Sequence, residues 1–110
     1  KYLWSEYEIL SKLQHPNIVR YVDFEYKERR NRLSASIYME YCKGGDLSQY
    51  TSRHGIAGKS VSEKQFWLIS YQLASALLYC HTGLRADEFG ITVDSHWTRP
   101  VLHRDIKPAN

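Results

Sequence analysis

The sequence predicts an α+β fold, and three patterns carry that prediction. Apolar residues recur at helical spacing over residues 2–14 and again over residues 62–81. Between those segments, residues 18–27 and 33–39 alternate between apolar and polar positions, as strands do. Because only a short charged turn separates the two alternating segments, we expect them to form one antiparallel hairpin with a buried face.

The first predicted helix, residues 2–14, places two glutamates in opposite environments. On a helical wheel, Glu6 lies at the centre of an apolar stripe, within about 60° of its members. The stripe consists of Tyr2, Leu3, Ile9, Leu10 and Leu13. Glu8 points the opposite way, beside Trp4, Ser11 and Lys12. A carboxylate within the stripe needs a partner unless it reaches solvent from the helix edge, since unpaired burial is costly. The helix should end before Pro16.

The predicted hairpin is followed by a break and a short helix. Its inward positions are Ile18, Val22, Phe24 and Tyr26 in the first strand and Leu33, Ala35, Ile37 and Met39 in the second. Its outward positions in the first strand are Tyr21, Asp23, Glu25 and Lys27. Gly44 and Gly45 break the chain, and Asp46 suits the N-cap of a helix to about Tyr50. Residues 51–60 are expected to form a loop.

The second long helix has the clearest boundaries. Ser62 and Gln65 match a capping box, with Ser60 and Glu63 as a competing register, and Gly83 ends the helix. Helical spacing of its apolar residues predicts a buried core helix to about His81: Phe66, Ile69, Leu73, Leu77 and Cys80. Residues 83–100 then show no clear periodicity. Connections of that length are uncommon in compact domains, so we interpret this segment as an insertion.

Composition excludes several classes of protein. A chain of 110 residues with 43% hydrophobic and 25% charged residues is globular rather than disordered. Two cysteines are too few for a disulfide framework, which favours an intracellular location, cytoplasmic or nuclear. The turn at residues 27–32 alone carries a net charge of +3, which equals the formal charge of the whole chain. The charges of the remaining residues therefore balance, which argues against an extended nucleic-acid surface. No apolar run approaches the length of a membrane span.

The last eight residues carry the strongest chemical signal. They read His103-Arg104-Asp105-Ile106-Lys107-Pro108-Ala109-Asn110 and match the catalytic-loop pattern His-Arg-Asp-Leu-x-x-x-Asn, with Ile106 in place of Leu. Phosphoryl transfer needs a carboxylate for the hydroxyl proton, a cation facing the phosphoryl group and an amide oxygen for Mg²⁺. Asp105, Lys107 and Asn110 supply these three groups within one short loop.

The whole chain resembles the middle of a eukaryotic protein kinase, within the NIMA-related serine/threonine family. The stretches that carry the resemblance are Ser5 to Tyr21, Tyr38 to Leu47, Gln72 to Leu77 and Leu102 to Asn110. The resemblance implies part of a two-lobed kinase fold: helix C, the hairpin of strands four and five, the hinge, helices D and E, and the catalytic loop. Residues 1–39 would belong to the N-lobe, 40–45 to the hinge and 46–110 to the C-lobe, with the insertion at about 83–100.

The resemblance also assigns roles to individual residues. Glu6 would pair with the ATP-positioning lysine of the third kinase strand. Met39 would be the gatekeeper beside the adenine; the alternative for Met39 is an ordinary core residue, and the two are compatible. Backbone atoms of Glu40 and Cys42 would bind the adenine, and Asp46 would contact the ribose. Asp105 and Lys107 would be catalytic, and Asn110 would hold Mg²⁺. His103 would be structural, and Arg104 would meet an activation-loop phosphate.

These roles imply an ATP-dependent kinase acting on serine and threonine hydroxyls of protein substrates. Lys107 favours that specificity over tyrosine by family pattern. A pseudokinase scaffold is the alternative, and a nucleic-acid module would rest on the charged turn alone. A metal site made from His81, His96, His103 and Cys80 is disfavoured, because their spacing lacks a paired-ligand motif. The glycine-rich loop, the third-strand lysine and the Asp-Phe-Gly motif lie outside this chain, so we expect a fragment that is inactive alone.

Overall fold

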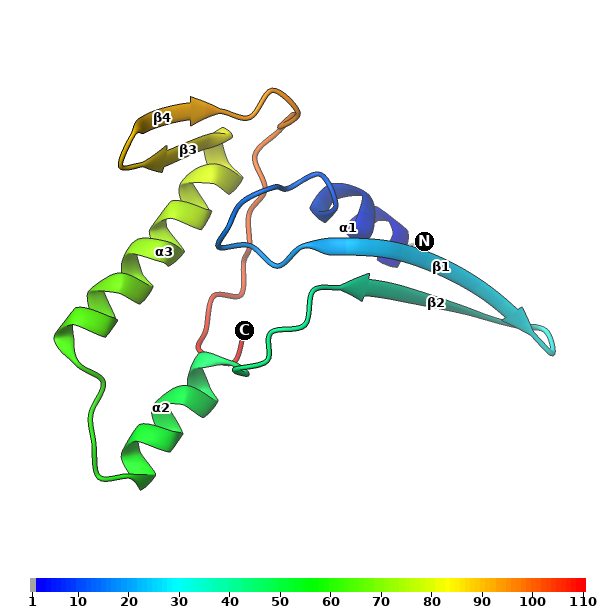
Figure 1. The fold of residues 1–110 in the computed structure, drawn as a ribbon. Coiled ribbons are helices and arrows are strands. Elements are labelled where there is room, and N and C mark those ends of the chain that lie inside the picture. The colour runs from blue at the N-terminus through cyan, green and yellow to red at the C-terminus, as the bar shows by residue number, and fades with distance from the viewer. Residues whose placement is uncertain (1) are drawn as a thin grey trace.

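The structure is a computed structural model that describes residues 2–110, apart from the side chain of Tyr2. The expected place of Tyr2 in the apolar stripe therefore lies outside the described residues. Three helices and two separate antiparallel hairpins make up the described part of the chain, which is an α+β architecture. Figure 1 shows the C-terminal segment running from the second hairpin down to the start of α2. In that part of the chain, none of the helices is long and apolar enough to cross a membrane.

Helix α1 (Tyr2–Leu10) packs its largest rings against the first hairpin. The ring of Trp4 meets Phe24 edge-on at 5.1 Å, and Tyr7 lies 5.4 Å from the same ring. Trp4, which was predicted to point outward with Glu8, contacts the hairpin and is still 44% exposed. Glu6 is exposed rather than buried in the stripe. The hairpin covers the aromatic side of the helix because rings bury more area than the aliphatic residues around Glu6. The helix also ends at Leu10 instead of residue 14, and a turn follows.

Strands β1 (Tyr21–Arg29) and β2 (Arg32–Met39) form the first hairpin. Its register is irregular between Tyr21 and Asp23, which resembles a β-bulge. The irregularity reverses two predicted positions: Val22 is 57% exposed, whereas Tyr21 lies against Tyr7 at 6.5 Å. Beyond it Phe24 pairs with Ile37, and both are half-buried as predicted. The prediction of one buried face is wrong for Tyr26, Leu33 and Met39, which are 48%, 70% and 49% exposed, because among the described elements only α1 packs on this hairpin. The strand also starts at residue 21, so Ile18 lies outside it.

Helix α2 (Leu47–Ile56) begins at the predicted N-cap but runs further than predicted. The Asp46 carboxylate accepts the Gln49 N–H at 2.8 Å, and the Gln49 side chain accepts the Asp46 N–H at 2.9 Å. This reciprocal capping box stabilises the first turn. The loop expected at 51–60 is wrong for residues 51–56. Gly55 within the helix lowers its propensity by only about 1 kcal/mol, which neighbouring turns tolerate.

Helix α3 (Glu63–Thr82) confirms the predicted boundaries. The Ser62 hydroxyl accepts the Gln65 N–H at 3.2 Å, and Gly83 ends the helix with a left-handed φ of 74°. The prediction of a buried core helix is wrong for this chain, since only Ala76 and Tyr79 of the helix are buried. Among the described elements only β3 lies close to α3, so its earlier turns have no covering layer.

Strands β3 (Leu84–Asp87) and β4 (Gly90–Val93) form a second hairpin inside the segment that sequence periodicity left unassigned. Four-residue strands are too short to show a convincing alternation. The buried residues of the described chain are Leu13, Ala76, Tyr79, Gly83 and Asp94. The core therefore sits where the segment after α1, the end of α3 and the insertion meet.

Candidate catalytic and nucleotide-binding site

The three predicted catalytic-loop residues are bonded to one another. The Asn110 amide donates to the Asp105 carbonyl at 3.0 Å and to Asp105 Oδ2 at 2.9 Å. Lys107 Nζ lies 3.8 Å from the same Oδ2. Both charged side chains remain accessible, with 54% of Lys107 and 66% of Asp105 exposed. The loop thus presents a carboxylate, a cation and an amide on one open surface.

The backbone on the N-terminal side of Asp105 turns sharply. The Asp105 N–H donates to His103 Nδ1 at 3.1 Å, so a neutral His103 carries its proton on Nε2. Between them, Arg104 has a φ of 68°, in the left-handed region that only glycine adopts freely. Such strained residues persist where the surrounding structure holds them, and they cluster at functional sites. The His103 contact gives that histidine a structural part in the turn.

Two backbone hydrogen bonds anchor the loop to helices. Val101 N–H donates to the Cys80 carbonyl of α3 at 2.9 Å. Ser48 N–H, in the first turn of α2, donates to the Pro108 carbonyl at 3.1 Å. The second bond brings the loop beside Asp46, the N-cap of α2, as Figure 1 shows for the red end of the chain.

The predicted adenine-binding backbone atoms are accessible between β2 and α2. Two hydrogen bonds join Glu40 to Arg20. The Glu40 N–H donates to the Arg20 carbonyl at 2.8 Å, and Glu40 Oε2 accepts the Arg20 N–H at 2.9 Å. Met39 is 49% exposed at the end of β2. Among residues 2–110, no hydrogen bond engages the Glu40 carbonyl or the Cys42 N–H. Asp46 uses Oδ1 as a helix cap, which leaves its second oxygen for another donor.

Glu6 is not brought to the catalytic loop by this chain. It lies exposed on α1. Burial, followed by the nearby Glu6 charge, raises the pKa of the Tyr21 hydroxyl above its usual value. The Glu6 carboxylate therefore lies near Tyr21, the first residue of β1.

A cavity of about 620 Å³ is separate from the catalytic loop. It lies between the segment after α1 and the start of β1, and among the predicted site residues only Glu40 lines it. We therefore assign the candidate site from the hydrogen bonds of the loop and not from the cavity.

The residues present fit a magnesium ion held jointly with phosphates. Among residues 2–110, no three histidine, cysteine, aspartate or glutamate side chains gather as a metal site. The Asn110 Nδ2 bonds to Asp105 leave Oδ1 without a donor from the described residues. Mg²⁺ takes one or two such protein oxygens together with water and substrate phosphates, so Asn110 is a suitable ligand.

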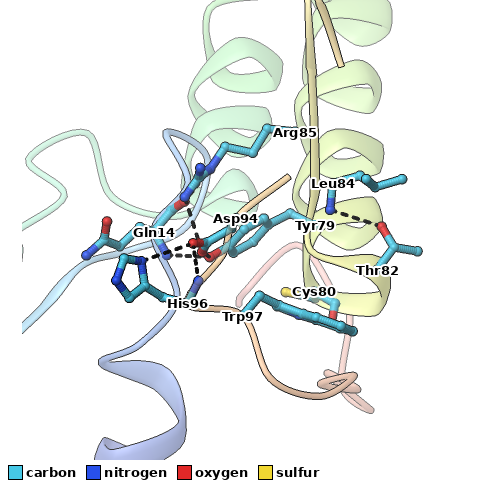
Figure 2. Close-up of polar contacts among 9 residues, drawn as sticks. All are labelled: Gln14, Tyr79, Cys80, Thr82, Leu84, Arg85, Asp94, His96 and Trp97. Atoms are coloured by element: carbon cyan, nitrogen blue, oxygen red, sulfur yellow. Dashed lines mark hydrogen bonds and ion pairs between the residues drawn. The ribbon is translucent and has the colours of Figure 1, made fainter. Parts of the chain in front are cut away.

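One buried cluster was missed by sequence reasoning. The hydroxyl of Tyr79 donates to Asp94 Oδ2 and accepts the Gln14 N–H at 2.9 Å. Arg85 Nη2 lies 3.3 Å from the same Asp94 oxygen (Figure 2). The available signal was weak: Asp94 directly follows a short β-branched run, and Tyr79 lies about 120° from the apolar stripe predicted for its helix. The burial of Tyr79 therefore contradicts the predicted inner face.

Comparison with known proteins agrees with the geometry of the loop. The sequence matches the protein kinase domain family over residues 1–110, so the chain belongs to the protein kinases. Within that class, its relatives place it in the NIMA-related serine/threonine branch. The fold class predicted from the sequence, part of an α+β kinase domain, is thereby confirmed.

Three relatives illustrate the likeness. The G2-specific protein kinase nimA of Emericella nidulans is 38% identical over 98% of this chain and 17% of its own length. The G2-specific protein kinase fin1 of Schizosaccharomyces pombe is 39% identical over 100% of the chain and 15% of its own length. Human serine/threonine-protein kinase Nek2 is 41% identical over 98% of the chain and 21% of its own length. The chain therefore spans about a fifth or less of these relatives.

Proposed function

We propose that the protein carrying this chain transfers the γ-phosphoryl group of ATP to serine and threonine hydroxyls of protein substrates. The observation that carries the proposal is the bonded set of Asp105, Lys107 and Asn110 in an open loop. A scaffold without catalysis would not need a carboxylate and a cation held together and left accessible. The likeness to kinases named for serine and threonine supports the specificity.

Asp105 is the group that receives the substrate proton. Its Oδ2 accepts the Asn110 amide and faces Lys107, whereas Oδ1 has no donor among the described residues. Oδ1 is therefore available to orient the substrate hydroxyl and take up its proton. Lys107, 3.8 Å from Asp105 Oδ2, would supply a cation to the negative charge that develops on the transferred group, which would stabilise the transition state more than the ground state. Magnesium, held by Asn110 and the phosphates, would neutralise charge on those phosphates.

The segment between β2 and α2 is proposed to be the adenine-binding hinge. Its free Glu40 carbonyl and Cys42 N–H form an acceptor and donor pair suited to the adenine edge. Met39 would flank the ring, and the second oxygen of Asp46 would contact the ribose. We accordingly propose residues 1–39 as N-lobe, 40–45 as hinge and 46–110 as C-lobe. The bond between Ser48 and Pro108 supports this arrangement, because it places the end of the hinge beside the loop.

The environment proposed for the parent protein is intracellular, cytoplasmic or nuclear. Both cysteines are free thiols, as in a reducing compartment. ATP and Mg²⁺ are the proposed cofactors, and proteins with accessible serine or threonine are the proposed substrates.

The test uses the full-length protein with ATP labelled on the γ-phosphate and a serine- and threonine-containing protein acceptor. The expected result is magnesium-dependent label on serine and threonine but not tyrosine. Asn110→Ala should shift the Mg²⁺ concentration needed for half-maximal transfer upward by about 10-fold. Ser48→Ala is the control, because its contact with the loop uses the backbone alone. Absence of transfer by the intact protein over the whole magnesium range would favour the scaffold.

A further inference from the structure

The insertion holds the segment that follows α1 through a polar cluster whose centre, Tyr79 and Asp94, is buried and whose contacts reach the exposed residue Gln14. Arg85 Nε donates to the Gln14 carbonyl at 2.8 Å, and the Tyr79 hydroxyl accepts the Gln14 N–H at 2.9 Å. Both backbone groups of Gln14 are thus held by side chains more than sixty positions away in the sequence. Figure 2 shows Arg85 and Tyr79 converging on Gln14 and Asp94.

Asp94 is the centre of this cluster. Its side chain is 5% exposed and receives the Tyr79 hydroxyl and the Arg85 guanidinium on Oδ2, and the His96 N–H on Oδ1 at 3.0 Å. Its own N–H donates to the Gly83 carbonyl at 3.0 Å. The Arg85 guanidinium also lies 5.1 Å from the centre of the Tyr79 ring. A buried carboxylate with this many partners holds one geometry, because each partner lost leaves a buried polar group unpaired.

The same cluster is joined to the start of the catalytic loop. Trp97 follows Asp94, and its Nε1 donates to the Cys80 carbonyl at 3.3 Å. Val101 N–H donates to the same carbonyl, one residue before Leu102 opens the loop segment. A side chain at Gly83 would meet the Trp97 ring at 2.8 Å, so the insertion packs tightly on the end of α3. The insertion thus contacts Gln14 through Arg85 near its start, and its C-terminal end continues into the catalytic loop.

The position of Gln14 makes this connection relevant to Glu6. Gln14 lies four residues beyond Leu10, the last residue of α1, and Leu13 between them is 7% exposed. A fixed Gln14 and a buried Leu13 restrain the C-terminal end of α1. Glu6 is on that helix, one turn before its end. Rotation or translation of α1 would therefore require the Gln14 contacts to break.

We propose that Arg85 and Asp94 are positioning residues of the insertion that fix the orientation of α1, and with it Glu6, relative to the catalytic loop. The proposal rests on the function proposed above, in which Glu6 pairs with the ATP-positioning lysine. Neither residue touches a substrate. Both act on the reaction through Gln14.

The test is a double-mutant cycle in the full-length protein. Asp94→Asn removes the charge that faces Arg85 and should lower kcat/KM about 10-fold, since small displacements of catalytic groups reduce rates strongly. In a Glu6→Gln background the same substitution should lower kcat/KM less than twofold, because the residue it positions is already impaired. A general loss of folded protein would instead lower activity by the same factor in both backgrounds.

A second readout does not depend on activity. Hydrogen exchange at the Gln14 amide should be at least about 10-fold faster in Asp94→Asn, because the Tyr79 hydroxyl that holds it loses its own acceptor. Asp87→Asn is the matched control, since it makes the same chemical change at the exposed end of β3 in the same hairpin. We expect it to change neither the rate nor the exchange.

A milder variant covers the case in which Asp94→Asn folds poorly. Arg85→Lys keeps the positive charge, but its single ammonium cannot reproduce the guanidinium fork that reaches both Gln14 and Asp94. It should lower kcat/KM about threefold, again only when Glu6 is present.

Two results would overturn the proposal: equal losses with and without Glu6, or unchanged exchange at Gln14. An inactive wild-type protein with accelerated exchange in Asp94→Asn would instead remove the kinase function and leave the restraint of Gln14 in place.

Discussion

The catalytic loop and the insertion are neighbours at the end of α3, yet their side chains are used in opposite ways. In the loop, Asp105 and Lys107 are more than half exposed and bond within the loop itself. In the insertion, Asp94 is 5% exposed and bonds to the end of α3 and, through Arg85 and Tyr79, to the segment after α1. Reacting groups must meet a substrate, whereas the groups that orient them work best where water is excluded.

This difference predicts two kinds of mutational effect. Changes in the loop should lower the rate of phosphoryl transfer and leave the free energy of unfolding nearly unchanged, because exposed substitutions rarely alter stability. Changes in the buried cluster should lower stability first.

Lys107→Ala should show the loop behaviour most clearly. We expect kcat to fall by about 10²–10³-fold, since a cation facing developing phosphoryl charge is lost. The free energy of unfolding should change by less than about 0.5 kcal/mol. Steady-state kinetics and denaturant unfolding of the full-length protein measure both quantities, with exposed Lys59→Ala as the control. A large loss of stability would mean that Lys107 supports the fold.

Glu6→Gln should lower kcat/KM for ATP by about 10–100-fold, whereas Glu8→Gln should leave it within about twofold. Glu6 would lose a charge partner in a desolvated site, and exposed pairs such as any made by Glu8 are worth about 0–1 kcal/mol. The two glutamates are on the same helix and both are exposed here, so they form a matched pair. Equal kinetic constants for the two variants would show that the wrong glutamate was assigned.

Tyr79→Phe should show the loss of stability expected for the buried cluster. It leaves the Gln14 N–H and Asp94 Oδ2 without the hydroxyl between them, so the free energy of unfolding should fall by about 1–3 kcal/mol. Tyr71→Phe, at a position 58% exposed on the same helix, should cost less than about 0.5 kcal/mol. Thermal or denaturant unfolding separates the two. Equal stability losses would show that the Tyr79 hydroxyl is not a special contact.

The smallest expected effect is a pH dependence at His15, whose ring lies 5.3 Å from Tyr79. Burial, then the charge of Arg85, lowers the pKa of His15 below its usual value. As the pH falls below about 6.5, His15 therefore takes up a proton more readily in the unfolded chain than in the folded one. The free energy of unfolding should decrease as the pH is lowered. Unfolding measured from pH 7.5 to 5.5 should show a shallower slope for His15→Gln, with exposed His81→Gln as control. An unchanged slope would exclude His15 as the source.

The catalytic loop could be predicted from the sequence because its chemistry lies in consecutive residues. Asp105, Lys107 and Asn110 fall within one motif, and the structure brings them into contact. Helix ends with local signals were also predictable, as Ser62 and Gly83 show, because capping is decided by residues within one turn.

The buried cluster could not be predicted because its partners are distant in sequence. No local pattern joins Gln14 to Arg85, and four-residue strands leave too little periodicity to reveal the hairpin between Arg85 and Asp94. The packing of Trp4 on the hairpin could not be predicted for a related reason. A helical wheel counts apolar positions, but the rings of Phe24 and Tyr21 on another element decide which side of the helix is covered.

The most direct test of the central claim, that the loop is a working phosphoryl-transfer site, is the single-turnover rate of Asp105→Asn with ATP affinity measured on the same sample. We expect a rate about 10²–10⁴-fold lower, with ATP affinity within about twofold of the wild type, because Asp105 is proposed to act on the substrate hydroxyl and not on the nucleotide. A near-normal rate for Asp105→Asn would contradict the assignment of the catalytic loop.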